Sequence, residues 1–339
     1  MNEGLVEDHQ LHTFLDLPKS VRKYRTFIVP AGIGDFAWIY AKLVNLDEPF
    51  NIGVADEGRR HPVAMRSLPY FQLLPNVAYA TLAGVHSGEI VKYARRWNGR
   101  QLPITDPALL CFNLLLEAGT PLPQILPDLP TTWHYPIFRP DWAELEADII
   151  IPKGQKTVAI FTSNDDYFKA TYDEQGKPIK DAHAETLPPE RWALLLDYLQ
   201  KRLPDHRILL IGAAWDGQYM KTIRELCWYR GFTVDVVDDR HIAVSLAILR
   251  RCRFFIAAAS GLGIIAEYER VPTMHLYPPT LIKQVRYPGT KHERVLDVKL
   301  MGSWESPEMV AAGKSISIPF DYPQQLVPDI EALIENTND

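Results

Sequence analysis

Residues 25–43 constrain the fold of this chain more than any other stretch. An apolar strand over 26–29 runs into the turn Gly-Ile-Gly-Asp35, and an amphipathic helix follows with its apolar side chains on one face. Glycines at 32 and 34 let the backbone turn sharply and approach a ligand closely. Open α/β sheets place their chemistry beyond the carboxyl ends of the strands, so Asp35 stands where a catalytic carboxylate is expected. Its alternative role is that of a helix N-cap.

The strand-and-helix alternation continues along the chain in two series. In the first series, strands are expected at 50–55 and 77–82, and helices at 63–74 and 106–118. A proline-rich stretch, 122–140, then forms the connection between domains, because proline stiffens the chain and cannot continue a helix. The second series predicts strands at 157–161, 207–211, 233–237, 254–258 and 273–277, with helices at 188–199, 217–229, 243–250 and 264–269.

This alternation predicts an α/β protein with mostly parallel sheets. Its 339 residues suit two domains. We expect an N-terminal Rossmann-like domain over 1–140 and a C-terminal one over 150–320. A C-terminal helix is expected within 321–339, with packing back on the N-terminal domain as one option.

Composition indicates a soluble protein. Hydrophobic residues make up 47% and charged residues 23% of the chain, which is ordinary for a globular domain. No apolar run approaches the roughly 20 residues of a membrane span, and the acidic start differs from a secretory signal. The three cysteines form no C-x-x-C pair, which favours buried thiols in a reducing compartment. We therefore expect a cytoplasmic location, in a bacterial cell or a phage-infected host.

Charge is distributed unevenly. The net charge of −6 argues against a general nucleic-acid binder. Between Glu57 and Ile104, however, seven basic residues face two acidic ones, with aromatic residues interleaved. This window is either a solvated face or an electropositive rim for an anionic partner. The candidate acceptor-binding residues are Arg59, Arg60, Arg95 and Arg96, together with Asn113 and Glu117, which share one face of the helix expected at 106–118.

Residues 260–263, Ser-Gly-Leu-Gly, open a predicted helix after an apolar strand. Backbone N–H groups and the helix dipole favour anions at such a turn, which makes it a plausible diphosphate cradle. Its alternative role is a tight turn without a ligand. The acidic pairs at 165–166 and 238–239 lie in predicted loops, so we interpret them as solvated turn residues and expect no metal site.

Three places carry a resemblance to a known family. They are the strand before Gly34-Asp35, the strand 208–211 followed by Gly212 and Asp216, and the run from Ser245 to Gly263. Together they resemble the GT-B glycosyltransferases, and within them the ADP-heptose:lipopolysaccharide heptosyltransferases of glycosyltransferase family 9. The resemblance covers roughly residues 24–335 and implies two Rossmann-like domains facing each other across a cleft.

The resemblance also implies an inverting, metal-independent transferase that needs no cofactor beyond a nucleotide-diphosphate sugar as co-substrate. Asp35 would act as the general base, with Gly34 on the acceptor side. The donor-binding residues would be Thr162, Ser163, Gly212, Asp216, Ser260, Gly261, Leu262 and Gly263. The chain departs from the family at Ala259, where Asp or Asn is usual, and at Ile264, where His is usual. Both departures touch the donor pocket and bear on which sugar is transferred, a heptose or a hexose or pentose.

The acceptor and two rival functions stay open. A phosphorylated or lipid-linked glycan and a hydroxymethylated pyrimidine in phage DNA, such as 5-hydroxymethylcytosine, both suit the basic window. A sugar-nucleotide epimerase shares the two-domain architecture and would need acidic and histidine groups, for which His183, His241 and His275 are available. A nucleotide-sugar-binding protein without turnover is the non-catalytic rival. The sequence assigns no oligomeric state.

Overall fold

A computed structural model describes residues 17–29, 32–55, 68–83, 123, 126–134, 139–162, 188–258, 260–277, 306–319 and 323–337. The chain divides into two compact units, with a boundary between Trp133 and His134, and each unit is described by itself. Several predicted features lie outside the described residues: the helix at 106–118 with Asn113 and Glu117, the basic residues Arg59, Arg60, Arg95 and Arg96, Ser163, His183 and Ala259.

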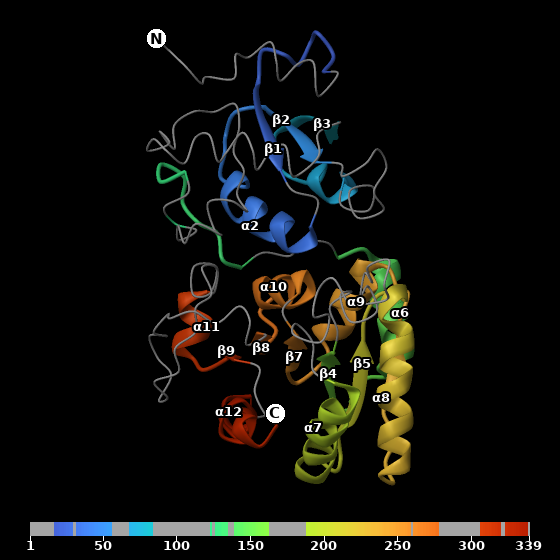
Figure 1. Ribbon diagram of the computed structural model, residues 1–339. Helices are drawn as coiled ribbons and strands as arrows, with labels where there is room; N and C mark the ends of the chain where they lie inside the picture. The colour runs from blue at the N-terminus through green and yellow to red at the C-terminus, as the bar shows by residue number, and fades with distance from the viewer. Residues whose placement is uncertain are drawn as a thin grey trace, which may run out of the picture. The chain divides into compact units, whose positions relative to one another are not determined.

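The first unit contains a parallel three-stranded sheet in the order β1-β2-β3 (Figure 1). Its strands are β1 (Arg25–Val29), β2 (Phe50–Ala55) and β3 (Val77–Ala83). Helix α2 (Ile33–Leu43) follows β1. The rings of Phe36 on α2 and Phe71 meet edge to face at 5.2 Å, so the helix is fixed to the core by aromatic packing. The predicted strands and the helix after β1 are confirmed.

The second unit is built on a six-stranded parallel sheet in the order β6-β5-β4-β7-β8-β9. Its strands are β4 (Thr157–Phe161), β5 (Arg207–Ile211), β6 (Asp235–Val237), β7 (Phe255–Ala258), β8 (Thr273–Tyr277) and β9 (Ser315–Pro319). The order runs outward in one direction from β4 and in the other from β7. This is the strand order of dinucleotide-binding folds, in which ligands bind at the carboxyl ends of the strands where the order reverses.

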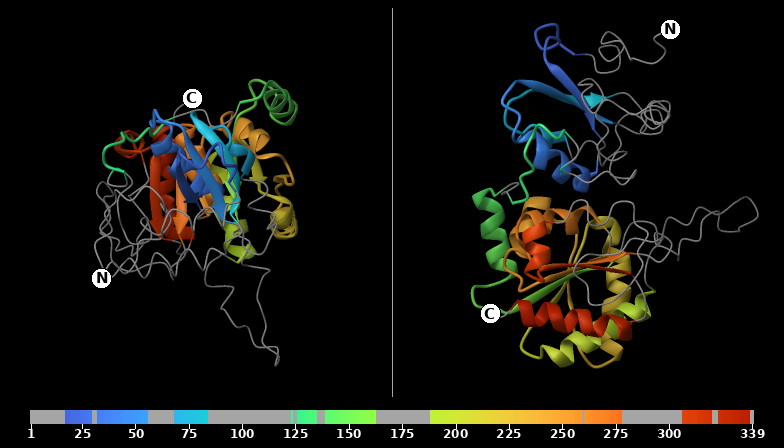
Figure 2. Two further views of the ribbon diagram at one scale, coloured as in Figure 1. Left: turned by 90° about the horizontal axis from the view of Figure 1, so that it is seen from above. Right: turned by 90° about the vertical axis from the view of Figure 1, so that its left-hand side faces the viewer.

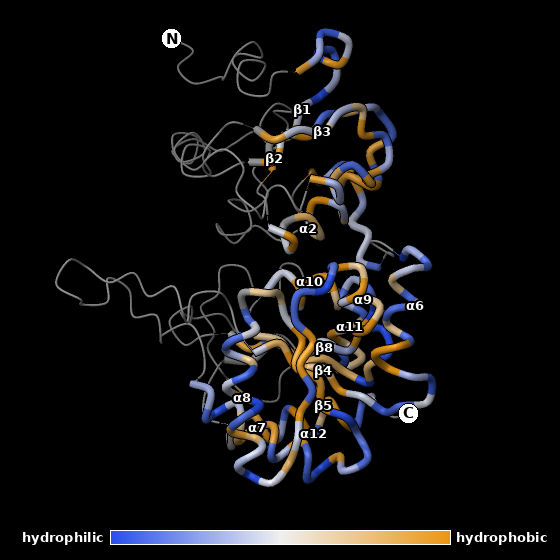
Figure 3. The backbone as a smooth tube through the Cα atoms, turned by 90° about the vertical axis from the view of Figure 1, so that its right-hand side faces the viewer, coloured by the Kyte–Doolittle hydropathy of each residue, from blue (hydrophilic) through white to orange (hydrophobic). Residues whose placement is uncertain are grey.

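Helices cover both faces of this sheet (Figure 2). One face carries α7 (Pro189–Arg202), α8 (Gly217–Tyr229) and α12 (Pro323–Asn336). The other carries α6 (Asp141–Ile150), α9 (Ile242–Leu249) and α10 (Gly261–Tyr268). The central strands are buried and hydrophobic, whereas the outer helices alternate in hydropathy (Figure 3). This is expected for a parallel sheet that is covered on both sides.

Helices α6 and α11 (Pro307–Ala311) and strand β9 go beyond the prediction. Helix α6 starts directly after Pro140, the last residue of the stretch expected to connect the domains. It buries two alanines and leaves Trp142, Leu145 and Ile149 exposed by 47%, 65% and 80%, so its apolar residues do not follow a single buried stripe. Strand β9 has the sequence Ser-Ile-Ser-Ile-Pro. It lies at the sheet edge, where a terminal proline is tolerated.

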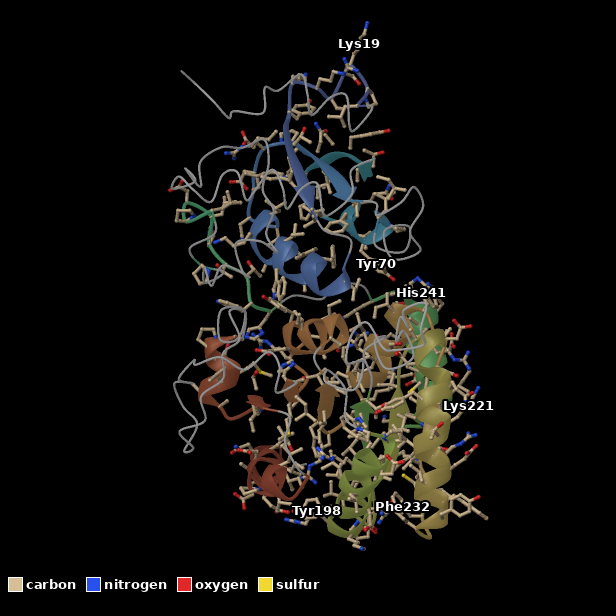
Figure 4. The ribbon with its side chains drawn as sticks, viewed as in Figure 1. Lys19, Tyr70, Tyr198, Lys221, Phe232 and His241 are labelled. Carbon is tan, nitrogen blue, oxygen red and sulfur yellow. The ribbon has the colours of Figure 1, made fainter. Side chains whose placement is uncertain are left out.

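Helix α12 packs on α7 within the second unit. The hydroxyl of Tyr198 on α7 (Figure 4) donates to the Glu331 carboxylate of α12. Arg202 Nε donates to both oxygens of the same carboxylate at 2.9 and 3.0 Å. The described hydrogen bonds of this C-terminal helix are made with α7 and, at its end, with Arg253 and Gly313, all in the second unit. No helix in the described part of the chain is long and apolar enough to cross a membrane.

Lys42 holds the proline-rich connection on the first unit. Its side chain is fully buried on α2, and Nζ donates to Leu129 O at 2.6 Å, Thr131 Oγ1 at 3.1 Å and Pro123 O at 3.5 Å. All three acceptors are uncharged. Burial lowers the pKa of the Lys42 ammonium to about 8, because an apolar environment disfavours the charged form.

Candidate active site

The candidate site lies where the strand order of the second unit reverses. Strands β4 and β7 are neighbours there, with Phe161 paired to Ala257. Thr162 follows β4, and Ser260 follows β7 at the start of α10. Parallel strands end at the same edge of a sheet, so these two residues belong to one edge, the one at which this fold binds ligands.

Thr162 is fully buried, and among the described residues its Oγ1 has no hydrogen-bond partner. A buried polar atom in this state costs roughly 1–3 kcal/mol of stability. A native structure rarely carries such a cost without a use for the atom. The Thr162 hydroxyl is therefore available to form a hydrogen bond with a ligand at the carboxyl end of β4.

Ser260 shapes the anion-binding end of α10. It is the N-cap, with extended backbone, and its Oγ accepts a hydrogen bond from Gly263 N–H at 3.2 Å. The N–H groups of Gly261 and Leu262 belong to the first turn and have no partner inside the helix. With the positive end of the helix dipole, they form a site suited to phosphate groups.

The sequence analysis assigned Gly263 to donor binding alone. In the structure Gly263 also has a packing role. A Cβ atom at this position would lie 3.1 Å from His275 Nδ1 and 3.2 Å from the Cβ of Ala257. The first turn of α10 therefore lies directly on β7 and β8. Absence of a side chain allows this close approach of helix and sheet, as with the third glycine of dinucleotide-binding turns.

A buried polar network joins α10 to strands β8 and β9 of the sheet. His275 on β8 and Glu267 on α10 are each 1% exposed, and His275 Nε2 lies 3.1 Å from Glu267 Oε2. The same carboxylate accepts from Ser315 Oγ at 2.9 Å and from Ser306 N–H at 2.7 Å. Ser306 Oγ in turn lies 3.1 Å from the ring nitrogen Nε2 of His134. Because buried polar networks rigidify when satisfied, this one fixes the height of the helix on the sheet.

A second buried carboxylate anchors the far end of α10. Glu269, its C-cap, has a fully buried side chain. Its Oε2 accepts from Arg139 Nη2 at 2.6 Å and lies 3.2 Å from Arg250 Nη1. Arg250 also pairs with Glu144 on α6. Both ends of α10 are thus tied to the rest of the second unit.

The turn after β5 is shaped by Gly212 and Asp216. Asp216 is 2% exposed, and its Oδ2 accepts from Ala213 N–H at 2.8 Å. A Cβ atom on Gly212 would lie 2.9 Å from that carboxylate, so glycine is what lets the turn close. These described contacts of Asp216 are internal to its own turn, and its contact with a donor stays a prediction.

Sequence reasoning missed the proximity of Asp238 and α8. A Cβ atom at Gly217, the first residue of α8, would lie 2.5 Å from Asp238 Oδ2. A carboxylate beside a helix N-terminus is favourable, and Lys221 Nζ (labelled in Figure 4) lies 4.0 Å from it. The signal available in the sequence was the glycine at the helix start, which is separated from Asp238 by helix α8 and strand β6.

In the first unit, α2 begins at Ile33 with Gly32 as its N-cap. Asp35 is therefore the third helical residue, and the alternative in which it serves as the N-cap is wrong. Gly34 is buried in the first turn. The strand, the glycine turn and the helix stand in the predicted order, so the backbone of Asp35 lies just beyond the carboxyl end of β1, as expected.

The two described histidines among those proposed for an epimerase, His241 and His275, have other contacts. His275 lies beneath α10, as described above. His241 is the N-cap of α9, and its Nδ1 accepts from Ala243 N–H at 3.2 Å. Burial lowers the pKa of His241, which suits a ring nitrogen that must stay unprotonated to accept. Within the described ranges, no three His, Cys, Asp or Glu side chains gather as metal ligands.

Comparison with known proteins identifies the fold. No family model matches the sequence, and no curated protein matches it. The structure of Escherichia coli ADP-heptose lipopolysaccharide heptosyltransferase II matches with a TM-score of 0.51 and 13% identity, over 92% of this chain and 99% of that one. The glycosyl transferase family 9 structure from Veillonella parvula matches with a TM-score of 0.55 and 13% identity, over 92% and 98%.

A UDP-GlcNAc 2-epimerase from Methanocaldococcus jannaschii matches with a TM-score of 0.44 and 12% identity, over 92% of this chain and 93% of that one. The two glycosyltransferase matches span nearly the full length of both chains. The parallel sheets of both units confirm the predicted α/β fold class. The chain has the GT-B fold, in a form that resembles glycosyltransferase family 9.

Proposed function

We propose that this protein is a glycosyltransferase that moves a sugar from a nucleotide-diphosphate sugar to an acceptor hydroxyl. The observation that carries the proposal is the buried, unpartnered hydroxyl of Thr162 beside the first turn of α10. A diphosphate at this edge would accept from that hydroxyl and from the N–H groups of Gly261 and Leu262. The likeness in fold to two glycosyltransferases supports the same assignment.

The proposed reaction inverts the anomeric centre. The acceptor oxygen forms a bond to the anomeric carbon while the bond from that carbon to the diphosphate oxygen breaks. The acceptor proton passes to the carboxylate of Asp35, a step that contributes typically 10²–10⁴-fold to the rate. The diphosphate leaves with its negative charge directed at the N-terminus of α10, which supplies positive potential without a metal.

We propose a polyanionic acceptor, with a phosphorylated glycan first and a hydroxymethylated pyrimidine in DNA second. Its support is the basic, aromatic-rich window between residues 57 and 104. Phosphate contacts make binding strongly dependent on salt. An anionic acceptor should therefore lose affinity steeply between 50 and 200 mM salt, whereas a neutral glycan should not.

The test is a donor screen that reads nucleoside-diphosphate release, donor binding and acceptor mass. UDP-, GDP- and ADP-sugars are offered with a phosphorylated glycan or hydroxymethylcytosine DNA. The variants are Asp35→Asn, Thr162→Val and Thr157→Val. Thr157 is a matched control at the other end of β4, 1% exposed, with its hydroxyl donating to Gln155 O at 3.4 Å.

We expect Asp35→Asn to bind donor normally and to lose turnover by about 10²-fold or more. Thr162→Val should weaken donor binding about tenfold or more, since hydrogen bonds to charged groups contribute roughly 1.5–3 kcal/mol. It should not lower the melting temperature, because the hydroxyl that it removes has no protein partner. Thr157→Val should leave donor affinity unchanged.

Other outcomes would redirect the assignment. Interconversion of donor sugars without an acceptor would establish an epimerase. Tight nucleotide binding with no turnover on any donor would favour a binding protein. If Thr162→Val and Thr157→Val had equal effects on donor binding, the donor would not lie at the carboxyl edge of β4.

A further inference from the structure

A basic groove lies at the edge of the second-unit sheet opposite to the candidate site. Its lining comes from the amino-terminal ends of the parallel strands, where β4 begins at Thr157, Arg253 precedes β7 and Lys314 precedes β9. The last turn of α12, ending at Thr337, closes one side. The cavity has a volume of about 470 Å³, within the range of small-molecule sites.

The charge of this groove is one-sided. Its lining includes Lys156, Arg251, Arg253, Lys314 and the ring of His206, and none of the described lining residues is Asp or Glu. Arg251 is matched by carboxylates outside the groove, Glu144 at 2.7 Å and Asp148 at 2.8 Å. The positive charge offered to a ligand is therefore that of Arg253 and Lys314.

Arg253 is held in place by neutral groups. Its Nε donates to Thr337 O at 3.0 Å and its Nη2 to Ile334 O at 2.9 Å. These carbonyls belong to the end of α12 and fix the guanidinium plane without a carboxylate. A pre-oriented guanidinium suits phosphate, because its fork of donors matches the phosphate oxygens.

The uncharged lining adds the side-chain amide of Gln155. The hydroxyls of Thr157 and Thr337 and the amide of Asn336 also line the groove, and they donate to the carbonyls of Gln155, Leu333 and Gly313. We propose that this groove binds a phosphate-bearing small molecule, at a site separate from the donor site. The proposal does not depend on glycosyl transfer, because every residue that carries it lies at the opposite edge of the sheet.

The experiment titrates full-length protein with inorganic pyrophosphate and follows backbone amide resonances by NMR. Gly154, Thr157 and Thr337 report on the groove, and Gly261 to Gly263 report on α10. We compare wild type with Lys314→Glu in the groove and with Lys153→Glu, an exposed lysine of the neighbouring turn that does not line it. Both variants change the net charge equally.

We expect saturable shifts at the groove amides that weaken as salt increases. Lys314→Glu should weaken this binding by at least tenfold, and Lys153→Glu by less than threefold. Shifts confined to the α10 amides would overturn the proposal while supporting the donor site. Equal weakening by the two variants would also overturn it, since general charge rather than a built site would then explain the binding.

Discussion

Replacing Lys42 with methionine should change the pH dependence of stability. The pKa of the buried ammonium is lowered from 10.5 to about 8, so the folded state binds this proton less tightly than the unfolded state does. A lowering of this size corresponds to roughly 3 kcal/mol. Below pH 8 the buried charge therefore lowers the free energy of unfolding by about that amount.

The sign follows from proton release. As pH rises from 8 towards 10.5, the folded state loses its proton first and the penalty disappears, so stability rises with pH. Between pH 7 and pH 10 the wild type should gain roughly 2–3 kcal/mol relative to Lys42→Met. Titration of other groups is common to both proteins and cancels in the difference. The absolute difference at pH 7 is less informative, because methionine also leaves three acceptor oxygens unpaired.

The assay is urea unfolding at several pH values, with the transition of the first unit resolved from that of the second. Lys19→Met, which removes an exposed lysine of the same unit, is the matched control. A pH dependence for Lys42→Met no steeper than that for Lys19→Met would refute the reasoning, since the Lys42 ammonium would then be as well solvated in the folded as in the unfolded protein.

Two further substitutions test the support of α10. Glu269→Gln removes the buried carboxylate from its two arginine partners and should lower the free energy of unfolding, measured in urea, by about 3–5 kcal/mol. The control is Glu48→Gln, in an exposed pair with Arg25, which should lower it by about 1 kcal/mol or less. Equal losses would contradict the buried role of Glu269. Gly263→Ala should cost about 1–3 kcal/mol, because its Cβ would press on the His275 ring. An unchanged melting temperature for Gly263→Ala would contradict this, since helix α10 and the sheet would then accommodate the added methyl group.

The strands were predictable because their signals are local. Runs such as Thr157–Phe161 and Arg207–Ile211 are short, apolar and bounded by turn residues, and the structure confirms them. Helix α6 was not predictable in this way, because its exposed Trp142 and Ile149 obscure the buried face formed by Ala143 and Ala147.

The positions of the candidate site residues were predictable, but their surroundings were not. Thr162 and Ser260 lie at the ends of neighbouring strands, as the βα pattern requires. The pairing of His275 with Glu267 depends on a helix crossing a strand at one particular height. The proximity of Gly217 to Asp238 likewise depends on tertiary packing. Neither contact has a sequence spacing that identifies it.

The anion-binding end of α10 presents mainly backbone N–H groups, and these are the same for every amino acid except proline. Mutations around the turn can therefore accumulate while the phosphate-binding geometry survives, provided that Gly263 stays small and Ser260 still accepts from its N–H. In the proposed donor site, a side-chain change such as that at Ile264 leaves these backbone donors in place. A phosphate site built from backbone groups therefore tolerates sequence changes that a site built from side chains does not.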